Sequence, residues 1–309
     1  MLALAEYPLR IDRVDLVGAD TNIIYRVRDE RGRLFALRLV PSRKWRTEAN
    51  LRAEVAWLGA LKQDSGITVP EVVATRSGDS FAQVRDALSG RQRRALLVTW
   101  LPGMLLTKRL TAVNVEKLGE LFGRLHAHAR GWNLPSDFPE LTFDSFLGRG
   151  DPNELFDGET RERVPAASRD VLTAARERVA KAYAAVTERC VIHCDLWHEN
   201  VKLYRGELAP IDFEDTIIAA PAHDLAMGLL DLAETVRTGR YETLSERFRG
   251  GYERIAPFPA GDLLGFQMGR VLWQLNWIAR FQPQYFDSAL TPRVELLETA
   301  LARDRLVYP

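Results

Sequence analysis

The stretch Val191-Ile-His-Cys-Asp195-Leu-Trp-His-Glu-Asn200-Val-Lys-Leu203 decides the fold, together with the segment Pro210-Ile-Asp212-Phe-Glu-Asp215 that follows it. A short apolar run at its start predicts a buried strand, which leads into an irregular polar loop. Two further short strands, separated by Arg205-Gly206, predict a hairpin between the loop and the second segment. The chain thus places an aspartate after a strand, an asparagine five residues later, and another aspartate after a short hairpin.

This order of residues suits phosphoryl transfer, which needs a positioned acceptor and metal ions on the phosphates rather than covalent help from the protein. We expect Asp195 to be the catalytic residue and to accept the hydrogen bond of an acceptor hydroxyl. Asn200 and Asp212 supply the hard oxygen ligands that Mg²⁺ prefers. Asp195 and Asn200 could instead be ordinary turn residues, because Asp and Asn favour loops through local hydrogen bonds. The combination of three polar residues with two flanking apolar strands favours the functional interpretation.

The two segments resemble the His-Gly-Asp-Leu-x-x-x-Asn and Ile-Asp-Phe-x-Asp motifs of the aminoglycoside phosphotransferase and choline kinase superfamily, a branch of the protein-kinase-like fold. Trp197 after the motif leucine is similar to the loop of fructosamine kinases. Leu125-His126 and His223-Asp224-Leu-Ala226 resemble two more elements of the family, so the resemblance covers most of the chain. It implies an α+β, two-lobed fold with a small antiparallel sheet lobe, a larger mainly helical lobe, and nucleotide in the cleft.

Residue patterning divides the chain in the same order. Apolar side chains recur at helical spacing in residues 47–62, and helical patterns predominate after residue 101. A Pro-, Gly- and Asp-rich surface connection is expected at residues 133–165, and a turn near Gly239. We therefore expect a nucleotide-binding lobe at residues 1–100 and a catalytic and substrate-binding lobe at residues 101–309. Strands of the first lobe are expected within residues 12–40, 69–75, 81–84 and 95–100.

The resemblance implies nucleotide contacts at two places in the first lobe. The segment Val17-Gly-Ala-Asp-Thr-Asn22 lies where the family has its phosphate-covering loop, which makes Gly18 and Asn22 expected contacts. It contains one glycine, so it could equally be a plain hairpin turn. Trp100 and Leu101 lie in a segment that resembles the hinge between lobes, where backbone groups meet adenine.

Arg38 stands where the family usually has a lysine on the third strand. Arginine keeps the charge and can hold phosphate oxygens bidentately, although the two side chains are not interchangeable. The resemblance implies an ion pair with Glu54 on the following helix, with Glu48 as the second choice. An exposed pair of no consequence is the alternative, in which case Lys44 would be the phosphate contact.

Several polar residues near the motifs have two interpretations. The resemblance implies that His193 braces the loop and that Asp224 hydrogen-bonds the loop from beneath, although Asp224 could also be a helix N-cap. We expect His198 and Glu199 to lie in solvated loop. Cys194 replaces the usual glycine, and we expect a tolerated small residue in a backbone that does not need positive φ.

Two groups on helices have mainly structural interpretations. His126 and His128 are two residues apart and face different ways, which disfavours a shared metal site. Trp273, Trp277 and Phe281 recur at helical spacing, which is typical of a core stripe, although the equivalent lobe supplies the acceptor pocket in the family.

Composition excludes several classes of protein. The 309 residues include 42 basic and 42 acidic side chains, so there is no basic surplus for nucleic acid or an anionic membrane. No apolar stretch reaches the roughly 20 residues that span a bilayer. Cys190 and Cys194 cannot complete a four-ligand zinc site, and we expect reduced thiols in a cytoplasmic protein.

The expected function is ATP- and Mg²⁺-dependent phosphoryl transfer to a hydroxyl of a small molecule. A Ser/Thr protein kinase of the same fold and a nucleotide-binding pseudokinase are the alternatives. The intact set of Asp195, Asn200 and Asp212 disfavours the pseudokinase, whereas Arg38 and the glycine-poor loop favour it. Neither the phosphate acceptor nor the oligomeric state can be read from the sequence.

Overall fold

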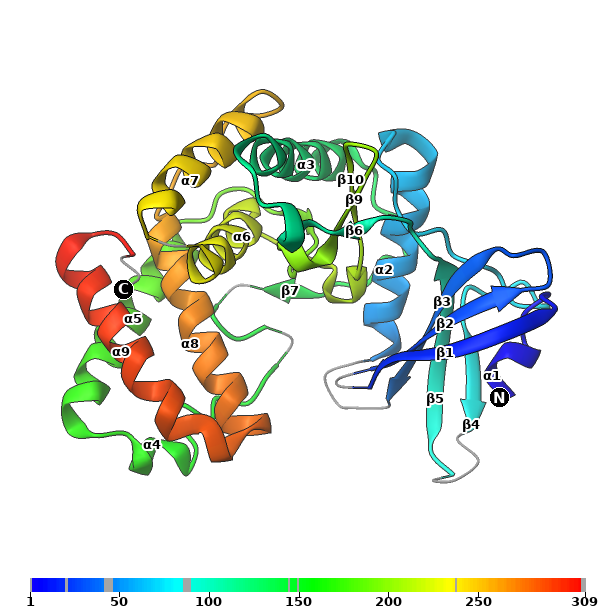
Figure 1. Ribbon diagram of the computed structural model, residues 1–309. Helices are drawn as coiled ribbons and strands as arrows, with labels where there is room; N and C mark the ends of the chain where they lie inside the picture. Colours follow the sequence, from blue (N-terminus) through cyan, green and yellow to red (C-terminus); the bar gives the residue numbers. More distant parts are fainter. Residues whose placement is uncertain are drawn as a thin grey trace. The chain divides into compact units, whose positions relative to one another are not determined.

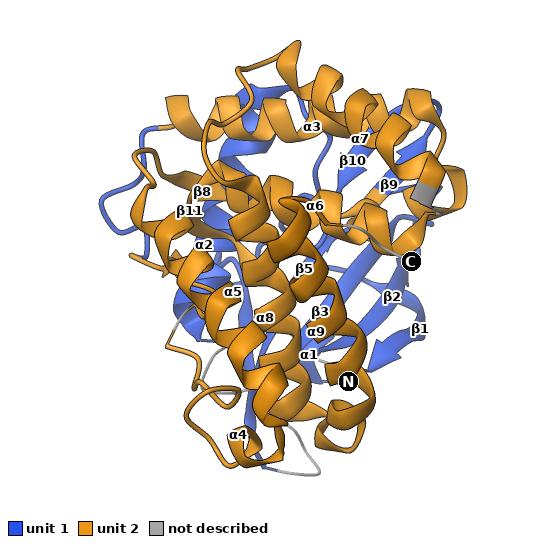
Figure 2. Ribbon diagram, turned by 90° about the vertical axis from the view of Figure 1, so that its left-hand side faces the viewer, with its two compact units in different colours: residues 1–104, 133–139, 202–214 blue, residues 105–132, 140–201, 215–309 orange. Residues whose placement is uncertain are grey.

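The computed structural model describes residues 2–19, 22–41, 47–85, 90–143, 145–148, 150–236 and 238–306. The helices and strands are labelled in Figure 1. Contacts divide the chain into two compact units, which are coloured separately in Figure 2. The first unit contains residues 1–104, 133–139 and 202–214, and the second contains residues 105–132, 140–201 and 215–309. Lys44 and residues 20 and 21 of the expected phosphate-covering loop lie outside the described residues.

Five antiparallel strands form the sheet of the first unit, in the order β1-β2-β3-β5-β4. The expected strand at residues 69–75 is reduced to a single bridge between Val72 and Val98. Pro70 lacks a backbone N–H and cannot donate to a strand ladder, which explains the interruption. The elements are α1 (Leu2–Ala5), β1 (Ile11–Ala19), β2 (Ile23–Asp29), β3 (Leu34–Pro41), β4 (Ala82–Arg85) and β5 (Gln92–Thr99).

Alternate side chains of strand β3 point to two different faces of the sheet, one apolar and one that carries Arg38. Phe35 and Leu37 are buried in a core that also contains Tyr7 and Leu97. Because successive side chains on a strand point to opposite faces, Arg38 lies on the other face, as the alternation of the sequence predicts. That face is the one on which the candidate phosphate site is built.

Helix α2 (Glu48–Ala60) confirms the helix expected from residue 47 onward. Thr47 and Asn50 form its capping box, with the Thr47 amide donating a 3.0 Å hydrogen bond to Asn50 Oδ1. A π-helical turn, Leu61–Ser65, continues the helix. Glu54 lies on its buried face.

Helices make up most of the second unit, and the expected mixed α+β class is confirmed. Within the described residues, no helix is both long and apolar enough to cross a bilayer. Two three-stranded sheets, ordered β7-β11-β8 and β10-β9-β6, complete the fold, and the chain passes between the units within β6 and β9. The helices are α3 (Ala112–Gly131), α4 (Thr160–Arg163), α5 (Ala166–Ala184), α6 (Pro221–Thr235), α7 (Thr238–Glu253), α8 (Leu263–Phe281) and α9 (Phe286–Arg303). The strands are β6 (Met104–Leu105), β7 (Thr142–Phe143), β8 (Cys190–Ile192), β9 (Val201–Tyr204), β10 (Glu207–Pro210) and β11 (Ile217–Ala219).

Two expectations about connections are wrong. Residues 133–165 are not one surface connection, because residues 133–139 group with the first unit and the rest contains β7 and α4. Gly239 is not at a turn but in the first helical turn of α7. Both errors come from treating Gly and Pro as chain breaks, whereas tertiary contacts decide where the helices begin.

Helices α3 and α7 meet backbone to backbone. A Cβ on Gly119 would lie 1.9 Å from the Phe248 carbonyl oxygen, and one on Gly251 would lie 1.9 Å from that of Glu116. Any side chain at either position would therefore push the helices apart. The close contact matters for the candidate site because α3 also carries His126. The His126 side chain contacts Asp224, which hydrogen-bonds the loop after β8.

We predict that Gly119→Ala destabilises the protein by about 3 kcal/mol, because the added methyl group meets rigid backbone. Gly131→Ala, at the open end of the same helix, is the control, since a Cβ there meets nothing within 4 Å. Thermal and denaturant unfolding of both variants checks the prediction. Equal stabilities of the two variants would contradict it.

Candidate active site

The buried carboxylate of Asp224 on α6 supports the polar loop that follows β8. It accepts hydrogen bonds from the backbone amides of His193 (3.0 Å) and Cys194 (2.6 Å), and His126 Nε2 on α3 lies 3.3 Å from its Oδ2. Burial alone would raise the pKa of Asp224, but the hydrogen bond from His126 and the neighbouring His193 and His223 lower it below its ordinary value. An ionised carboxylate thus joins two helices to the loop.

The helix-cap interpretation of Asp224 is wrong, because α6 begins at Pro221 with Ala220 as its N-cap. The hydrogen bonds to the loop are those that the resemblance implied. His193 also braces the loop as implied, since its Nδ1 accepts a 3.3 Å hydrogen bond from the Asp195 amide. The histidine is therefore structural and completely buried.

Cys194 corrects an expectation about the backbone. Its φ is +66°, so the loop does need the left-handed conformation that glycine usually supplies. A non-glycine residue there costs on the order of 1–2 kcal/mol, which the short hydrogen bond to Asp224 offsets. The thiol is buried, 3.6 Å from Nε2 of His223, whose Nδ1 hydrogen-bonds Tyr183 Oη at 2.7 Å.

Asp195 and Asn200 face each other within the loop. Asn200 Nδ2 donates to the Asp195 backbone oxygen (2.8 Å) and to its Oδ2 (2.9 Å). The Asp195 side chain is 29% exposed, so solvent or a substrate can reach it. Because Nδ2 of Asn200 is engaged, its Oδ1 is the atom that remains for a cation.

His198 is not part of a solvated loop, which corrects that expectation. It is 1% exposed, and its Nε2 lies 3.1 Å from Thr235 Oγ1. Burial lowers the pKa of His198 to about 4. Its neighbour Glu199 is exposed, as expected.

Sequence motifs missed two charged residues beside the loop. Arg270 Nη2 on α8 lies 3.5 Å from Asp195 Oδ1. Asp231 on α6 is 7% exposed. Burial raises the pKa of Asp231 to about 7, against the opposing effect of Arg270. Helical periodicity could have shown that both positions face inward, but no short pattern marks them.

Trp273, Trp277 and Phe281 of α8 are half-buried, so their core interpretation is wrong. The guanidinium carbon of Arg270 lies 4.1 Å from the centre of the Trp273 ring. The core face of the helix uses other positions: Leu264, Met268, Val271, Leu272 and Leu275.

In the first unit, three carboxylates surround the guanidinium of Arg38. It forms an ion pair with Glu54, and its Nη1 and Nε lie 3.2 Å from Asp212 Oδ1 and 3.8 Å from Glu214 Oε2. Burial alone would lower the pKa of Arg38, but the carboxylates of Glu54, Glu214 and Asp212 raise it well above its ordinary value. The pair with Glu54 excludes the inconsequential surface pair, because both side chains are almost fully buried. Glu48 contacts Arg52 instead.

Asn22 approaches this charge cluster through Glu214. Its Nδ2 donates a 2.5 Å hydrogen bond to Glu214 Oε2, and both residues are buried. Asn22 Oδ1 is buried without a hydrogen-bond partner among the described residues. Sequence reasoning missed Glu214, which occupies the variable position of the Ile-Asp-Phe-x-Asp motif.

The expected hinge and loop contacts have different environments. The Trp100 amide donates a 3.0 Å hydrogen bond to the Leu34 carbonyl, so this N–H is not available to an adenine. Its carbonyl and the backbone of the buried Leu101 remain as the expected contacts. Gly18 lies within β1, opposite Ile24 and beside a register shift, with open space where a Cβ would be.

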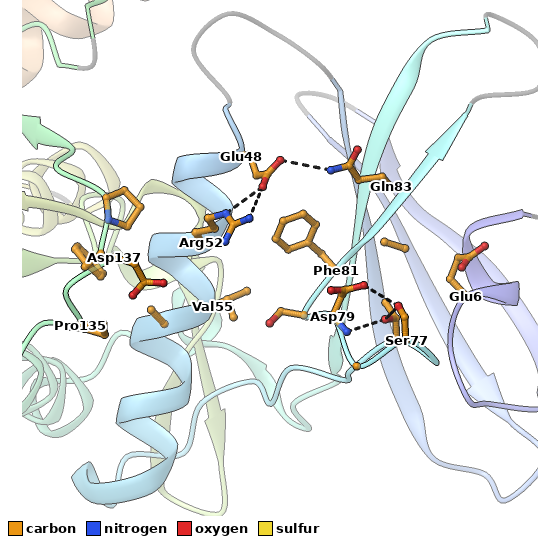
Figure 3. Close-up of a pocket in the computed structure, with 17 residues that line it drawn as sticks. Glu6, Glu48, Arg52, Val55, Ser77, Asp79, Phe81, Gln83, Pro135 and Asp137 are labelled. Atoms are coloured by element: carbon orange, nitrogen blue, oxygen red, sulfur yellow. Dashed lines mark hydrogen bonds and ion pairs between the residues drawn. The ribbon is translucent and has the colours of Figure 1, made fainter.

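A separate cavity of about 680 Å³ lies on the outer side of α2 (Figure 3). Glu48, Arg52 and Val55 of the helix line it, together with residues 75–83 and 135–139. None of the predicted site residues does. Helix α2 thus directs Glu54 toward Arg38 and its other face toward this cavity.

Asp212 and Asn200 carry oxygen donors of the kind that Mg²⁺ prefers. Among the described residues, no three or more His, Cys, Asp or Glu side chains form a cluster that could hold a metal ion. Mg²⁺ in nucleotide sites needs only one or two protein carboxylates besides phosphate oxygens. Asp212 supplies a carboxylate in the first unit, and Asn200 supplies an amide oxygen in the second.

Comparison with known proteins identifies the family. Residues 17–258 match the profile described as the phosphotransferase enzyme family. The chain belongs to this family. The resemblance inferred from the motifs is thereby confirmed.

Individual members are more distant. Homoserine kinase of Neisseria meningitidis serogroup B is 31% identical over 101 residues, and the match covers 32% of this chain and 33% of that protein. The chain thus aligns with only about a third of that relative. The fold is similar to a microcompartment-associated aminopropanol kinase (TM-score 0.78, 23% identity, 98% and 97% of the two chains covered). It is also similar to amicoumacin kinase, solved in complex with AMP-PNP, Ca²⁺ and Ami (TM-score 0.74, 16% identity, 94% and 91% covered).

We predict that Arg38→Ala destabilises the protein by roughly 3–5 kcal/mol, because it leaves buried carboxylates without their cation. Arg38→Lys should destabilise the protein much less, since the positive charge is kept. Arg28→Ala removes an exposed pair with Asp12 on the neighbouring strand and is the control, with a loss below about 1 kcal/mol. Unfolding midpoints measure all three. If Arg38→Ala were as mild as Arg28→Ala, the charge cluster would not be a buried one.

Proposed function

We propose that this protein transfers the γ-phosphoryl group of ATP to a hydroxyl group of a small molecule, in a reaction that needs Mg²⁺. The observation that carries the proposal is the Asp195–Asn200 pair on a loop held by the buried Asp224, in a chain of the phosphotransferase family.

In the proposed reaction, the acceptor oxygen forms a bond to the γ-phosphorus while the bond from that phosphorus to the β,γ-bridging oxygen breaks, and ADP leaves. The proton of the acceptor hydroxyl passes to the Asp195 carboxylate as the new bond forms. Asn200 fixes Oδ2 of this carboxylate, and the His193 ring fixes its backbone amide. The carboxylate is thus oriented before the acceptor binds, which removes a cost from the reactive step.

The first unit supplies the proposed nucleotide contacts. Arg38, oriented by Glu54, would bind α- and β-phosphate oxygens, and Gly18 and Asn22 would lie under the phosphates. The carbonyl of Trp100 and the backbone of Leu101 would meet adenine. AMP-PNP bound to the similar amicoumacin kinase supports ATP as the donor.

The charge of the cluster favours a divalent cation. Three carboxylates face the single guanidinium of Arg38, which leaves an excess of negative charge. Asp212 and Asn200 would hold Mg²⁺, which neutralises phosphate charge when bound. Metal-free ATP would be repelled by the same carboxylates.

A small-molecule acceptor is favoured over a protein acceptor. The similar proteins are named for homoserine, aminopropanol and amicoumacin, all small hydroxyl compounds. A pseudokinase is disfavoured because Asp195, Asn200 and Asp212 are all present. We place the reaction in the cytoplasm, which supplies ATP and keeps thiols such as those of the buried Cys190 and Cys194 reduced.

We predict that Asp195→Asn lowers turnover by roughly 10²- to 10⁴-fold while ATP affinity stays nearly unchanged, because only the proton acceptor is lost. Glu199→Gln, an exposed carboxylate of the same loop, is the matched control and should retain parental turnover. Release of ADP in the presence of mixed hydroxyl acceptors measures turnover, and calorimetry measures ATP binding. Turnover of Asp195→Asn within twofold of the parent would overturn the assignment.

A further inference from the structure

Arg270 carries a largely desolvated charge beside the catalytic loop. Its side chain is 15% exposed, and its contact with Asp195 Oδ1, at 3.5 Å, is at the outer limit of a hydrogen bond. Its Nε is buried without a hydrogen-bond partner among the described residues. A guanidinium has five N–H donors, and its burial is costly unless they meet an anion. The described residues therefore leave most of its binding capacity unused.

The ring of Trp273 holds this guanidinium in one orientation. The guanidinium carbon lies 4.1 Å from the ring centre, a distance typical of stacking on an aromatic face. A planar guanidinium held in this way loses little freedom when it binds a carboxylate through two parallel hydrogen bonds. The arrangement suits recognition of a carboxylate better than a structural ion pair.

Asp231 presents the opposite charge on the neighbouring helix. It is 7% exposed, and its Oδ2 has no hydrogen-bond partner in the part of the chain that the structure describes. Helices α6 and α8 pack together, and Arg270 and Asp231 influence each other electrostatically. No ion pair within 4.0 Å joins them in that part of the chain. A mostly buried guanidinium and a buried carboxyl group, whose pKa burial raises to about 7, thus lie near one another without a direct ion pair.

We propose that Arg270 and Asp231 bind the acceptor, and that the acceptor is a hydroxyl-bearing zwitterion of the amino-acid type. Its carboxylate binds Arg270, its ammonium group binds Asp231, and its hydroxyl reaches Asp195. One ligand then neutralises both buried charges. The inference rests on the proposed function, because it takes Asp195 as the residue that holds the hydroxyl.

The oxygen atoms of the transferred phosphoryl group are the other oxyanion that Arg270 could meet. A phosphoryl group offers no cation for Asp231, so the pair of charges favours the zwitterion. The two uses differ in their kinetics. A residue that binds the acceptor changes the KM for that acceptor, whereas one that stabilises the phosphoryl group changes kcat for every acceptor.

The test compares matched acceptors that differ by one charged group. One set is homoserine, 3-aminopropan-1-ol, which lacks the carboxylate, and 4-hydroxybutanoate, which lacks the amine. The other is serine, ethanolamine and 3-hydroxypropanoate. In at least one set, the parent protein should use the zwitterion with a kcat/KM at least about 10²-fold above both partial acceptors, because each missing group leaves a buried charge unpaired. Calorimetry of each compound measures binding independently of transfer.

Two variants assign the groups. Arg270→Gln should raise the KM for the zwitterion by roughly 10- to 100-fold and abolish its advantage over the amino alcohol. Asp231→Asn should abolish its advantage over the hydroxy acid. The KM for ATP should not change in either. Arg280→Gln is the matched control, because Arg280 lies on the same helix, stacks on Phe281 and pairs with Asp151 at 2.8 Å.

Each result decides the inference. Equal use of an amino alcohol and its zwitterion would overturn it and leave the proposed function intact. A uniform loss of kcat in Arg270→Gln with unchanged KM would also overturn it and assign the arginine to the phosphoryl group or to Asp195. Binding of a zwitterion that Arg270→Gln abolishes, without transfer, would support the inference and contradict the proposed function. Neither binding nor transfer of any compound would overturn both.

Discussion

The buried guanidinium of Arg38 is the constraint on which the first unit depends. A charge removed from water must meet opposite charge or destabilise the fold. Strand β3 contributes the charge, helix α2 contributes Glu54, and residues 202–214 contribute Asp212 and Glu214, so the cluster is complete only when all three segments are in place. The carboxylates outnumber the guanidinium, so the folded unit keeps an excess of negative charge at this place.

Asp224 has the corresponding part in the second unit. Its carboxylate accepts two loop amides and contacts His126 on α3, whose neighbouring turn is held close to α7 by Gly119. The loop can therefore keep Cys194 at positive φ and direct Asp195 and Asn200 toward each other. The packing of α3 against α7 thus helps to fix the orientation of the Asp195 carboxylate through His126 and Asp224.

The charged residues Arg270 and Asp231 of the second unit are less completely paired than Arg38. On adjacent helices, Asp231 is buried without an ion pair among the described residues, and Arg270, 15% exposed, contacts a single carboxylate, Asp195, at 3.5 Å, whereas Arg38 contacts three. A protein gains nothing in stability from such an arrangement. Such groups are instead what a binding site for a charged acceptor would need, and they differ from the Arg38 cluster, in which three carboxylates already surround the guanidinium.

Local patterns predicted a large part of this arrangement. The motif residues, the alternation that turns Arg38 away from Phe35 and Leu37, and the helix that carries Glu54 all follow from spacing along the chain. Glu214 and Arg270 could not be found in this way, because the residues that they contact are distant in sequence, and no short pattern marks Asp231. Local propensity was overridden where a tertiary hydrogen bond holds Cys194 at positive φ. The Trp100 amide, expected to meet adenine, instead donates to the Leu34 carbonyl on the neighbouring strand. His198, expected in solvated loop, is instead buried and contacts Thr235.

The Mg²⁺ dependence of ATP affinity tests the central claim most directly. Under the proposed function, the carboxylates around Arg38 would repel free ATP, whereas the Mg²⁺ complex carries less negative charge and would bring a cation for Asp212. Calorimetric titration of the intact protein with ATP, in excess Mg²⁺ and in excess chelator, measures the difference. The account predicts binding at least about tenfold tighter with Mg²⁺. Equal affinity under the two conditions, or no ATP binding in either, would contradict it.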